Sequence, residues 1–161
     1  MSLFYSPKYV FDTGPLIWMR NYPPDIFPSV WANLQSMFVA QEIISCREVY
    51  NELTQKFERE DEISKWAKAN DHFFLRPEPA ELIKVREILA AFPQLVSEDV
   101  FLATTPQAAP FVIAQAVVNN CILVHQEKYK VNAPKIPNVC ERFGVREMSL
   151  HDFFRTQGWT F

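Results

Sequence analysis

The sequence predicts an α/β fold, a three-layer α/β/α sandwich around a central, mainly parallel sheet. Short apolar runs of β-prone residues alternate with helical patterns along the chain, and no hairpin signal joins two of these runs. At 161 residues, of which 48% are hydrophobic, the chain can bury the core of one domain and is too short for two. We therefore expect a single domain over residues 1–161.

The first expected strand, Tyr9–Phe11, ends on a carboxylate and turns at once into a helix. Gly14 permits a tight turn, and Pro15 suits the first turn of a helix because a missing N–H is harmless there. Asp12 therefore lies where a strand stops and a helix starts. Two interpretations follow for its side chain: it caps the helix, or it belongs to a site at the end of the strand.

Further strands are expected along the chain. The run Cys121–Val124 is continuously apolar, which is typical of a central parallel strand, and Glu127 follows it closely. Short strands are also expected at Glu42–Ser45 and Val145–Met148, and residues 72–75 fit a brief strand or an extended linker.

Helical patterns fill the intervals between these runs. We expect helices over residues 16–20, 28–39, 47–56, 57–70, 78–92, 108–118 and 150–157, and a further helix that starts at residue 136. The stretch 99–107 fits a short helix before a loop. In the helix over 78–92, four apolar residues have the spacing of a core-facing stripe: Leu82, Val85, Ile88 and Leu89.

The composition excludes several classes of protein. A net charge of −3 argues against a broad basic face that coats nucleic acid. The three glycines form no dinucleotide fingerprint, phosphate loop or nucleophile elbow, and the three histidines show no metalloprotease or zinc-finger spacing. No apolar run could span a bilayer and no signal-peptide pattern is present, so we expect a cytoplasmic protein without membrane contact. Three cysteines without a CxxC pair suit reduced, buried thiols: Cys46, Cys121 and Cys140.

Chemistry in this chain must therefore come from carboxylates. Asp12 and Glu127 each follow a predicted central strand, while Glu48 and Glu52 share one face of the helix after another strand. In a doubly wound sheet these positions converge on one edge, where several carboxylates repel one another unless a cation neutralises them. Mg²⁺ or Mn²⁺ suits an all-oxygen site and supports phosphodiester hydrolysis. A solvated acidic helix face is the plainer alternative for Glu48 and Glu52.

Four segments then occur in a distinctive order: residues 10–17 (VFDTGPLI), 45–53 (SCREVYNEL), 110–116 (PFVIAQA) and 123–127 (LVHQE). Together they resemble the PIN domain, and more narrowly the VapC-like toxin ribonucleases of prokaryotic toxin–antitoxin systems. The stretches 22–31 and 135–140 and the ending Gly158-Trp159 extend the resemblance to one subfamily over almost the entire length. The resemblance implies an endoribonuclease that cleaves RNA with Mg²⁺ or Mn²⁺, a cognate antitoxin as its partner, and a homodimer as a further assembly.

The resemblance also implies roles for individual residues. The family's first metal-binding aspartate falls on Asp12, and its glutamate falls on Glu52, with Glu48 as the alternative register. Glu127 matches the acidic residue of the strand-end motif. Thr13 matches a small hydroxyl residue that could help to position metal-bound water.

Two positions depart from the family pattern. The strand-end motif usually carries a threonine where this chain has His125, and the helix start reads Ala109-Pro110-Phe111 where the family has Asp-Pro-Phe. A central carboxylate is therefore missing. Either the aspartate was replaced deliberately, which would allow a cell to produce a harmful ribonuclease, or the domain is naturally degenerate and binds RNA or a partner protein without cleaving. Loss of an oxygen ligand should weaken metal binding and lower turnover by orders of magnitude.

Other side chains have both a functional and a plainer interpretation. Four basic residues could hold phosphates near the acidic edge, although ordinary surface positions explain each of them: Lys56, Arg59, Lys128 and Lys130. Four tryptophans could stack on bases, but packing is expected for most of them: Trp18, Trp31, Trp66 and Trp159. His125 is expected to be structural rather than an acid or base, and His72 and His151 have no evident partner. A Rossmann-like binder of small ligands is disfavoured because no glycine-rich loop is present.

Overall fold

A parallel sheet forms the centre of the molecule. The computed structural model describes residues 6–55, 61–95 and 107–161. Within these ranges five strands pair in the order β3-β2-β1-β4-β5, and every pair is parallel. Their bounds are β1 (Tyr9–Phe11), β2 (Ile43–Cys46), β3 (Phe74–Leu75), β4 (Ile122–Val124) and β5 (Glu147–Met148). The expected α/β class is confirmed, and each observed strand begins and ends within two residues of an expected one.

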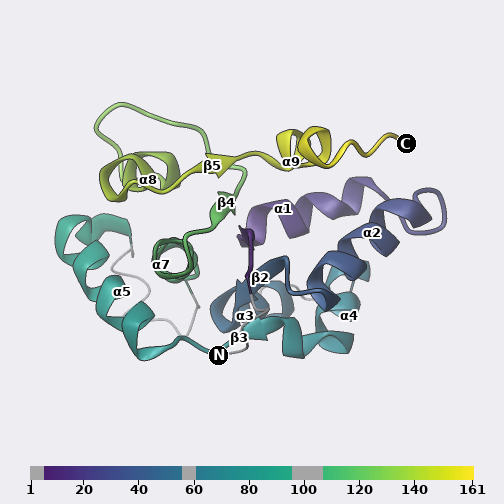
Figure 1. Cartoon of the computed structure of the whole chain (residues 1–161), viewed down its shortest axis with the longest axis horizontal. Coiled ribbons are helices and arrows are strands. Elements are labelled where there is room, and N and C mark those ends of the chain that lie inside the picture. Colours follow the sequence, from purple (N-terminus) through teal and green to yellow (C-terminus); the bar gives the residue numbers. More distant parts are fainter. Residues whose placement is uncertain (1–5, 56–60, 96–106) are drawn as a thin grey trace.

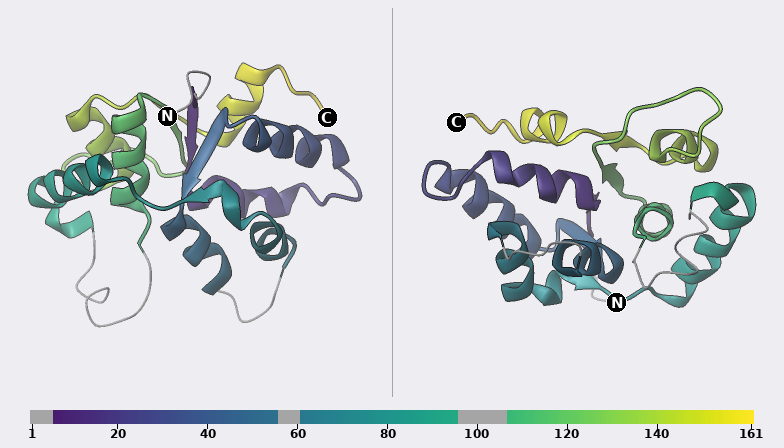
Figure 2. Two further views of the ribbon diagram at one scale, coloured as in Figure 1. Left: turned by 60° about the horizontal axis from the view of Figure 1, so that its bottom comes forward. Right: turned by 180° about the vertical axis from the view of Figure 1, so that it is seen from behind.

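Helices cover both faces of this sheet, which confirms the three-layer arrangement (Figure 1). Figure 2 shows α5, α7 and α8 on one side of the strands and α1, α2 and α9 on the other. The helices are α1 (Thr13–Trp18), α2 (Pro28–Val39), α3 (Arg47–Gln55), α4 (Glu62–Ala69), α5 (Pro79–Ala91), α7 (Ala109–Asn119), α8 (Ile136–Phe143) and α9 (Leu150–Gln157). The described ranges also contain three short 3-10 helices: η1 (Met19–Asn21), η2 (Asp71–Phe73) and η3 (Pro93–Leu95).

The central strand β1 is buried on both faces, as its unbroken apolar sequence predicts. Tyr9 and Phe11 each contact Phe153 of α9, with ring centroids 5.0 Å apart in both pairs. Phe11 also meets Phe38 of α2 at 6.0 Å. Val10 points to the opposite face and is fully buried there, on the side where α7 packs against β1, β2 and β4. Aromatic contacts therefore tie helices far apart in the sequence to one strand.

Prolines mark where several helices begin. α2, α5, α7 and α8 each have a proline in their first two positions, where its missing N–H removes no helical hydrogen bond. α1 begins at Thr13 rather than at the expected Leu16, because Pro15 also falls within the first turn and does not interrupt it. The chain continues as η1 to Asn21 and leaves the helical path before Pro23.

Two helix predictions need correction. Within the described residues, the helix expected over 57–70 begins only at Glu62, because Asp61 has an extended backbone and its side chain accepts the Ser64 N–H at 2.9 Å as an N-cap. In α5, Val85 and Ile88 are buried as expected, but Leu82 is 46% exposed. Because α5 packs chiefly against α7, only one stripe of it is covered. Residues 57–60 of the first helix lie outside the described ranges, as do residues 99–106 of the short helix expected over 99–107.

Candidate active site

The site lies where the order of the strands reverses. From β1 the chain moves outward through β2 and β3 on one side, and then through β4 and β5 on the other. β1 and β4 are therefore neighbours whose following segments diverge, which is where parallel sheets bind ligands. The N–H of Asp12 donates to the carbonyl of Val124 at 3.0 Å, so the carboxyl ends of the two strands lie level with each other.

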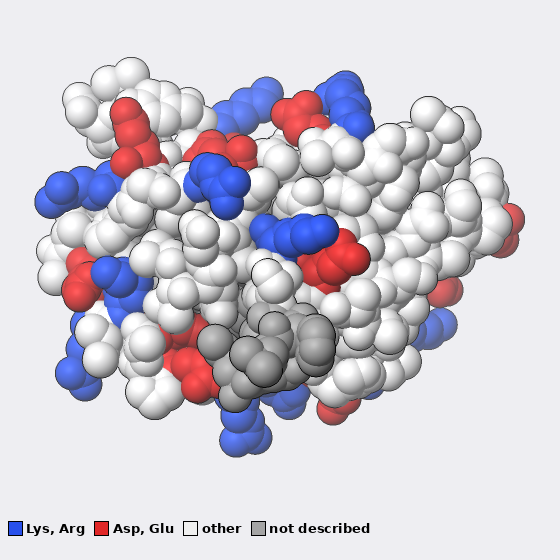
Figure 3. All heavy atoms as spheres, in the orientation of Figure 1, with Lys and Arg blue, Asp and Glu red and all other residues white. Residues whose placement is uncertain are grey.

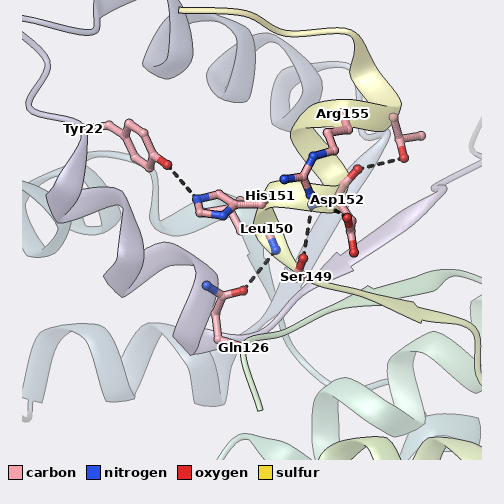
Figure 4. Close-up of polar contacts among 8 residues, drawn as sticks. Tyr22, Gln126, Ser149, Leu150, His151, Asp152 and Arg155 are labelled. Atoms are coloured by element: carbon pink, nitrogen blue, oxygen red, sulfur yellow. Dashed lines mark hydrogen bonds and ion pairs between the residues drawn. The ribbon is translucent and has the colours of Figure 1, made fainter. Parts of the chain in front are cut away.

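One glycine allows the two strand ends to close together. A Cβ placed on Gly14 would lie 3.2 Å from the Cβ of Gln126, a tighter approach than side chains normally tolerate. The Gln126 side chain in turn accepts the N–H of Leu150 at 3.0 Å, which joins this turn to the start of α9 (Figure 4). The lack of a side chain at position 14 therefore lets the β1–α1 turn lie against the segment that carries Glu127.

A cavity of about 550 Å³ opens at this edge of the sheet. Its wall includes the three expected ligands Asp12, Glu52 and Glu127 and also position 109. The remaining lining comes from η3, the start of α7 and the segment before α8: Gln94, Leu95, Gln107, Ala108, Lys130, Ala133, Pro134, Lys135 and Ile136. Side chains separated by more than a hundred positions thus meet at one cavity, as the sequence analysis predicts. Their roles as metal ligands stay a prediction.

Asp12 occupies the N-cap position of α1, but its side chain does not cap the helix. Its backbone is extended, with φ of −78° and ψ of 173°, and the side chain makes no cap hydrogen bond. The carboxylate is buried and lines the cavity. Its charge also acts on the core beneath it: burial, Glu48 and Asp12 together raise the pKa of Cys46 well above its usual value.

The helix α3 presents Glu52, and not Glu48, to the cavity. Glu52 Oε1 accepts the N–H of Ala108 at 2.7 Å, just before α7 begins. Glu48 lies one turn earlier, beside the Cys46 thiol, and is absent from the described lining of the cavity. Its Oε2 atom is buried, and no hydrogen-bond partner for it exists within the described part of the chain. The geometry therefore favours Glu52 over the alternative register.

Glu127 is held by the start of α8 and by His125. Its Oε2 atom accepts the N–H of Ile136 at 2.7 Å, which satisfies one of the unpaired donors at the N-terminus of that helix. The backbone N–H of Glu127 donates to His125 Nδ1 at 3.1 Å. Because Nδ1 accepts this bond, a neutral His125 carries its proton on Nε2, which lies 3.4 Å from Glu147 Oε1. His125 is buried and shapes the loop, as the structural interpretation expects.

At position 109 the cavity wall is a methyl group. Ala109 is the first residue of α7, so an aspartate there would face the same space as Asp12, Glu52 and Glu127. Thr13 is buried next to Asp12, and its hydroxyl has no hydrogen-bond partner among the described residues. Thr13 is likewise absent from the described lining of the cavity.

The donor set fits a hydrated divalent ion better than a fully enclosed one. Among the described residues, no three His, Cys, Asp or Glu side chains stand close enough together to hold a metal ion. Glu52 and Glu127 each commit one oxygen to a backbone N–H and keep the other. Mg²⁺ commonly retains several waters and uses only one or two carboxylates directly. The cavity could hold such an ion largely through water.

The other predicted residues divide between the cavity and the core. Lys130 lines the cavity, whereas Lys128 does not, and Lys56 and Arg59 lie outside the described ranges. Sequence analysis missed Lys135, which also lines the cavity; its place immediately before the helix start at Ile136 is the signal that could have indicated it.

The tryptophans and His151 differ in their surroundings. Three tryptophans are partly buried and pack against other rings, as the packing interpretation expects: Trp31, Trp66 and Trp159. Trp18 is 43% exposed. His151 has a partner that sequence analysis did not find, because Tyr22 lies 129 positions away; the Tyr22 hydroxyl meets His151 Nε2 at 2.9 Å (Figure 4).

Comparison with known proteins places the chain in one family. No curated protein matches it. A family model described as a domain of unknown function, DUF4411, matches residues 9–161, which include every residue of the cavity wall. This chain therefore belongs to the DUF4411 family.

Proposed function

We propose that this protein is a PIN-like, metal-dependent endoribonuclease, the toxin of a toxin–antitoxin pair, whose catalytic cavity lacks one carboxylate. One observation carries the proposal. Asp12, Glu52, Glu127 and the position that the resemblance makes an aspartate, Ala109, all line a single cavity at the switch point of the sheet. The PIN resemblance predicts that set from four separate segments of the sequence.

Under this proposal, the carboxylates of the cavity bind the metal ion and its lysines bind the RNA phosphate. Mg²⁺ or Mn²⁺ would activate water and stabilise negative charge on the phosphate. Asp12, Glu52 and Glu127 would hold the ion, partly through water. Lys130 and Lys135 line the same cavity and have no ion-pair partner within the described part of the chain, so they are placed to bind phosphate oxygens.

Charges of both signs are mixed on the face of the molecule that Figure 3 draws. Figure 3 shows Lys and Arg interspersed with Asp and Glu on the face in view, with no continuous basic field. Because its net charge is −3, we do not expect this protein to coat nucleic acid through a broad basic face. We expect it to bind a short stretch of RNA at the cavity. Because the carboxylates of the cavity repel the negatively charged RNA phosphate, a bound metal ion would be needed to offset that repulsion.

The decisive experiment restores the missing carboxylate. Ala109→Asp should bind Mn²⁺ more tightly by calorimetry and cleave a single-stranded RNA at least about 100-fold faster than the starting protein. Ala109→Asn is the matched control without the charge, and Asp12→Asn in the Ala109→Asp background should abolish the gain. An Ala109→Asp protein that is folded, binds no more Mn²⁺ and cleaves nothing would overturn the enzyme proposal.

A second candidate function is a non-catalytic module that binds RNA or a regulatory protein. The methyl group of Ala109 in the cavity wall favours it, as does the lack of a three-ligand group among the described residues. Under this alternative, RNA binds equally well to the starting protein and to Ala109→Asp, and neither cleaves. Binding measured by fluorescence anisotropy beside the cleavage assay separates the two functions.

The resemblance supplies the proposals on partners, and the lack of a membrane-spanning run or signal-peptide pattern in the sequence supplies the proposal on the compartment. We propose a cognate antitoxin, a homodimer as a further assembly, and a cytoplasmic location. None of the helices in the described ranges combines the length and apolarity needed to cross a membrane. Light scattering of the purified protein, alone and after co-expression with the neighbouring reading frame, tests the two assemblies.

A further inference from the structure

The connection from β4 to α8 lines two hollows, the acidic cavity and a second one. This segment swings outward beyond the neighbouring helices (Figure 1). The second hollow, about 560 Å³ in volume, shares Gln94, Ala133 and Pro134 with the acidic cavity. We name it the amide hollow, because its lining also includes the amides Asn132 and Asn138. The two hollows therefore adjoin each other at these three residues.

The connection is held in a fixed shape. The Asn138 side chain donates to the carbonyl of Lys130 at 2.7 Å, which ties the loop to α8. The N–H of Ala133 donates to the same carbonyl at 3.2 Å and closes a turn, in which Asn132 adopts a left-handed conformation with φ of +57°. A ligand that binds here therefore meets a surface that is already ordered, and little conformational entropy is lost on binding.

Tyr129 is the aromatic side chain that this loop displays. It is 56% exposed, and it lines both the amide hollow and a neighbouring hollow of about 430 Å³ beside Pro137 and Val145. Phe92 lies on the other part of the amide hollow. A large, exposed aromatic ring next to amide side chains can take a flat, polar ligand, which stacks on the ring and forms hydrogen bonds at its edges.

Charges of both signs lie around these hollows: the carboxylate Glu141 lines the amide hollow together with Tyr129, and two lysines line the adjoining acidic cavity. These lysines are Lys130 and Lys135. Lys130 therefore lines the acidic cavity, while its neighbour in the sequence, Tyr129, lines the amide hollow. An unpaired nucleotide matches this order, since its phosphate would lie at Lys130 and its base at Tyr129.

We propose that the amide hollow is a nucleobase subsite, which binds one unpaired base of single-stranded RNA stacked on Tyr129 beside the scissile phosphate. The proposal rests on the proposed function, because it takes RNA to be the ligand of the acidic cavity. It adds that the RNA must be single-stranded at this position, because a base inside a duplex is already stacked and cannot reach the ring.

Binding without cleavage tests the subsite. A fluorescent single-stranded RNA is titrated with the full-length protein in EDTA and again with Mg²⁺, and its anisotropy is followed. Tyr129→Ala should weaken binding about tenfold, within the range known for base–aromatic stacking, and Tyr129→Phe should restore most of it. Val131→Ala is the matched control, because Val131 is on the same loop, is 71% exposed, and lines neither hollow. An abasic oligonucleotide of equal length should bind the wild-type protein and Tyr129→Ala equally.

The outcomes separate this inference from the proposed function. If Lys130→Ala and Lys135→Ala weaken RNA binding while Tyr129→Ala does not, the base subsite is wrong and RNA binding at the cavity stands. If Tyr129→Ala weakens the binding of abasic and ordinary RNA alike, the ring does not stack on a base and the proposal is also wrong. If no variant binds RNA with or without Mg²⁺, the proposed function itself is contradicted.

Discussion

The carboxylate of Glu52 accepts the backbone N–H of Ala108 at 2.7 Å, although the two residues are 56 positions apart. This bond joins α3 to the start of α7 and thereby fixes position 109 against the cavity. One side chain thus serves the fold and also lines the cavity, so its two roles have to be separated by choice of substitution.

Glu52→Ala should lower the free energy of unfolding by about 1–3 kcal/mol, because the Ala108 N–H loses its acceptor. Glu52→Gln keeps an oxygen in the same place and should lose less than about 1 kcal/mol, while it removes the charge that the proposed Mn²⁺ site would use. Urea unfolding measures the first effect and calorimetry the second. Equal destabilisation by both substitutions would show that the charge, and not the hydrogen bond, stabilises this contact.

His125 is expected to be important for stability rather than for proton transfer. Its ring is buried, and its Nδ1 accepts the N–H of Glu127. His125→Asn places an amide oxygen near that acceptor position and should retain more stability than His125→Leu. The leucine leaves the Glu127 N–H without an acceptor, which should lower the free energy of unfolding by about 1–3 kcal/mol. Thermal unfolding compares the two. In the Ala109→Asp background, a His125→Asn protein that folds normally but has lost all RNA cleavage would instead indicate an acid–base role.

The stability of the protein should depend on pH through Glu81. Burial raises the pKa of this carboxyl group above its usual value, so the folded state favours its protonated form. Stability from this group is therefore present below the ordinary carboxyl pKa and is lost as pH rises through the raised value. Glu81→Gln keeps an acceptor for the Glu78 N–H, which Glu81 Oε1 binds at 3.3 Å, and removes the titration. The variant should match the wild-type protein at acid pH and exceed it at neutral pH in urea unfolding. A difference that does not vary with pH would exclude Glu81 as its source.

The three cysteines should be unreactive in the folded protein. All are buried and free, and burial raises the pKa of each thiol, that of Cys121 to about 11. A thiol with such a pKa is ionised to about one part in a thousand at pH 8, and the thiolate is the reactive form. Ellman's reagent should therefore detect almost no thiol until guanidinium is added, and then three per chain. One equivalent under native conditions would indicate local opening around one of the cysteines.

Most of the fold could be predicted because its signals are local. An apolar run such as Ile122–Val124 is buried wherever the chain places it, and a proline at a helix start acts within one turn. The N-cap at Asp61, which sets the start of α4, is also a local signal, but an N-cap residue is easily overlooked inside a long amphipathic pattern. Exposure of Leu82 could not be predicted, since it depends on how much of α5 its neighbour α7 covers.

The candidate site was predictable to a similar extent. Asp12 and Glu127 follow strand ends, and parallel strand ends share an edge, so their meeting follows from the topology alone. The choice between Glu48 and Glu52 depends on the rotation of α3 against α7, which no local pattern records. The amide hollow escaped prediction because Gln94 and Asn138 come from segments whose packing is set by tertiary contacts.

The outermost strands, β3 and β5, are only two residues long. So short a border leaves few unpaired amide groups on which another polypeptide could extend the sheet. Fibre-like growth by edge addition is disfavoured by the length of these strands alone. Two copies of this chain are accordingly expected to associate through helices or loops and not by merging their sheets.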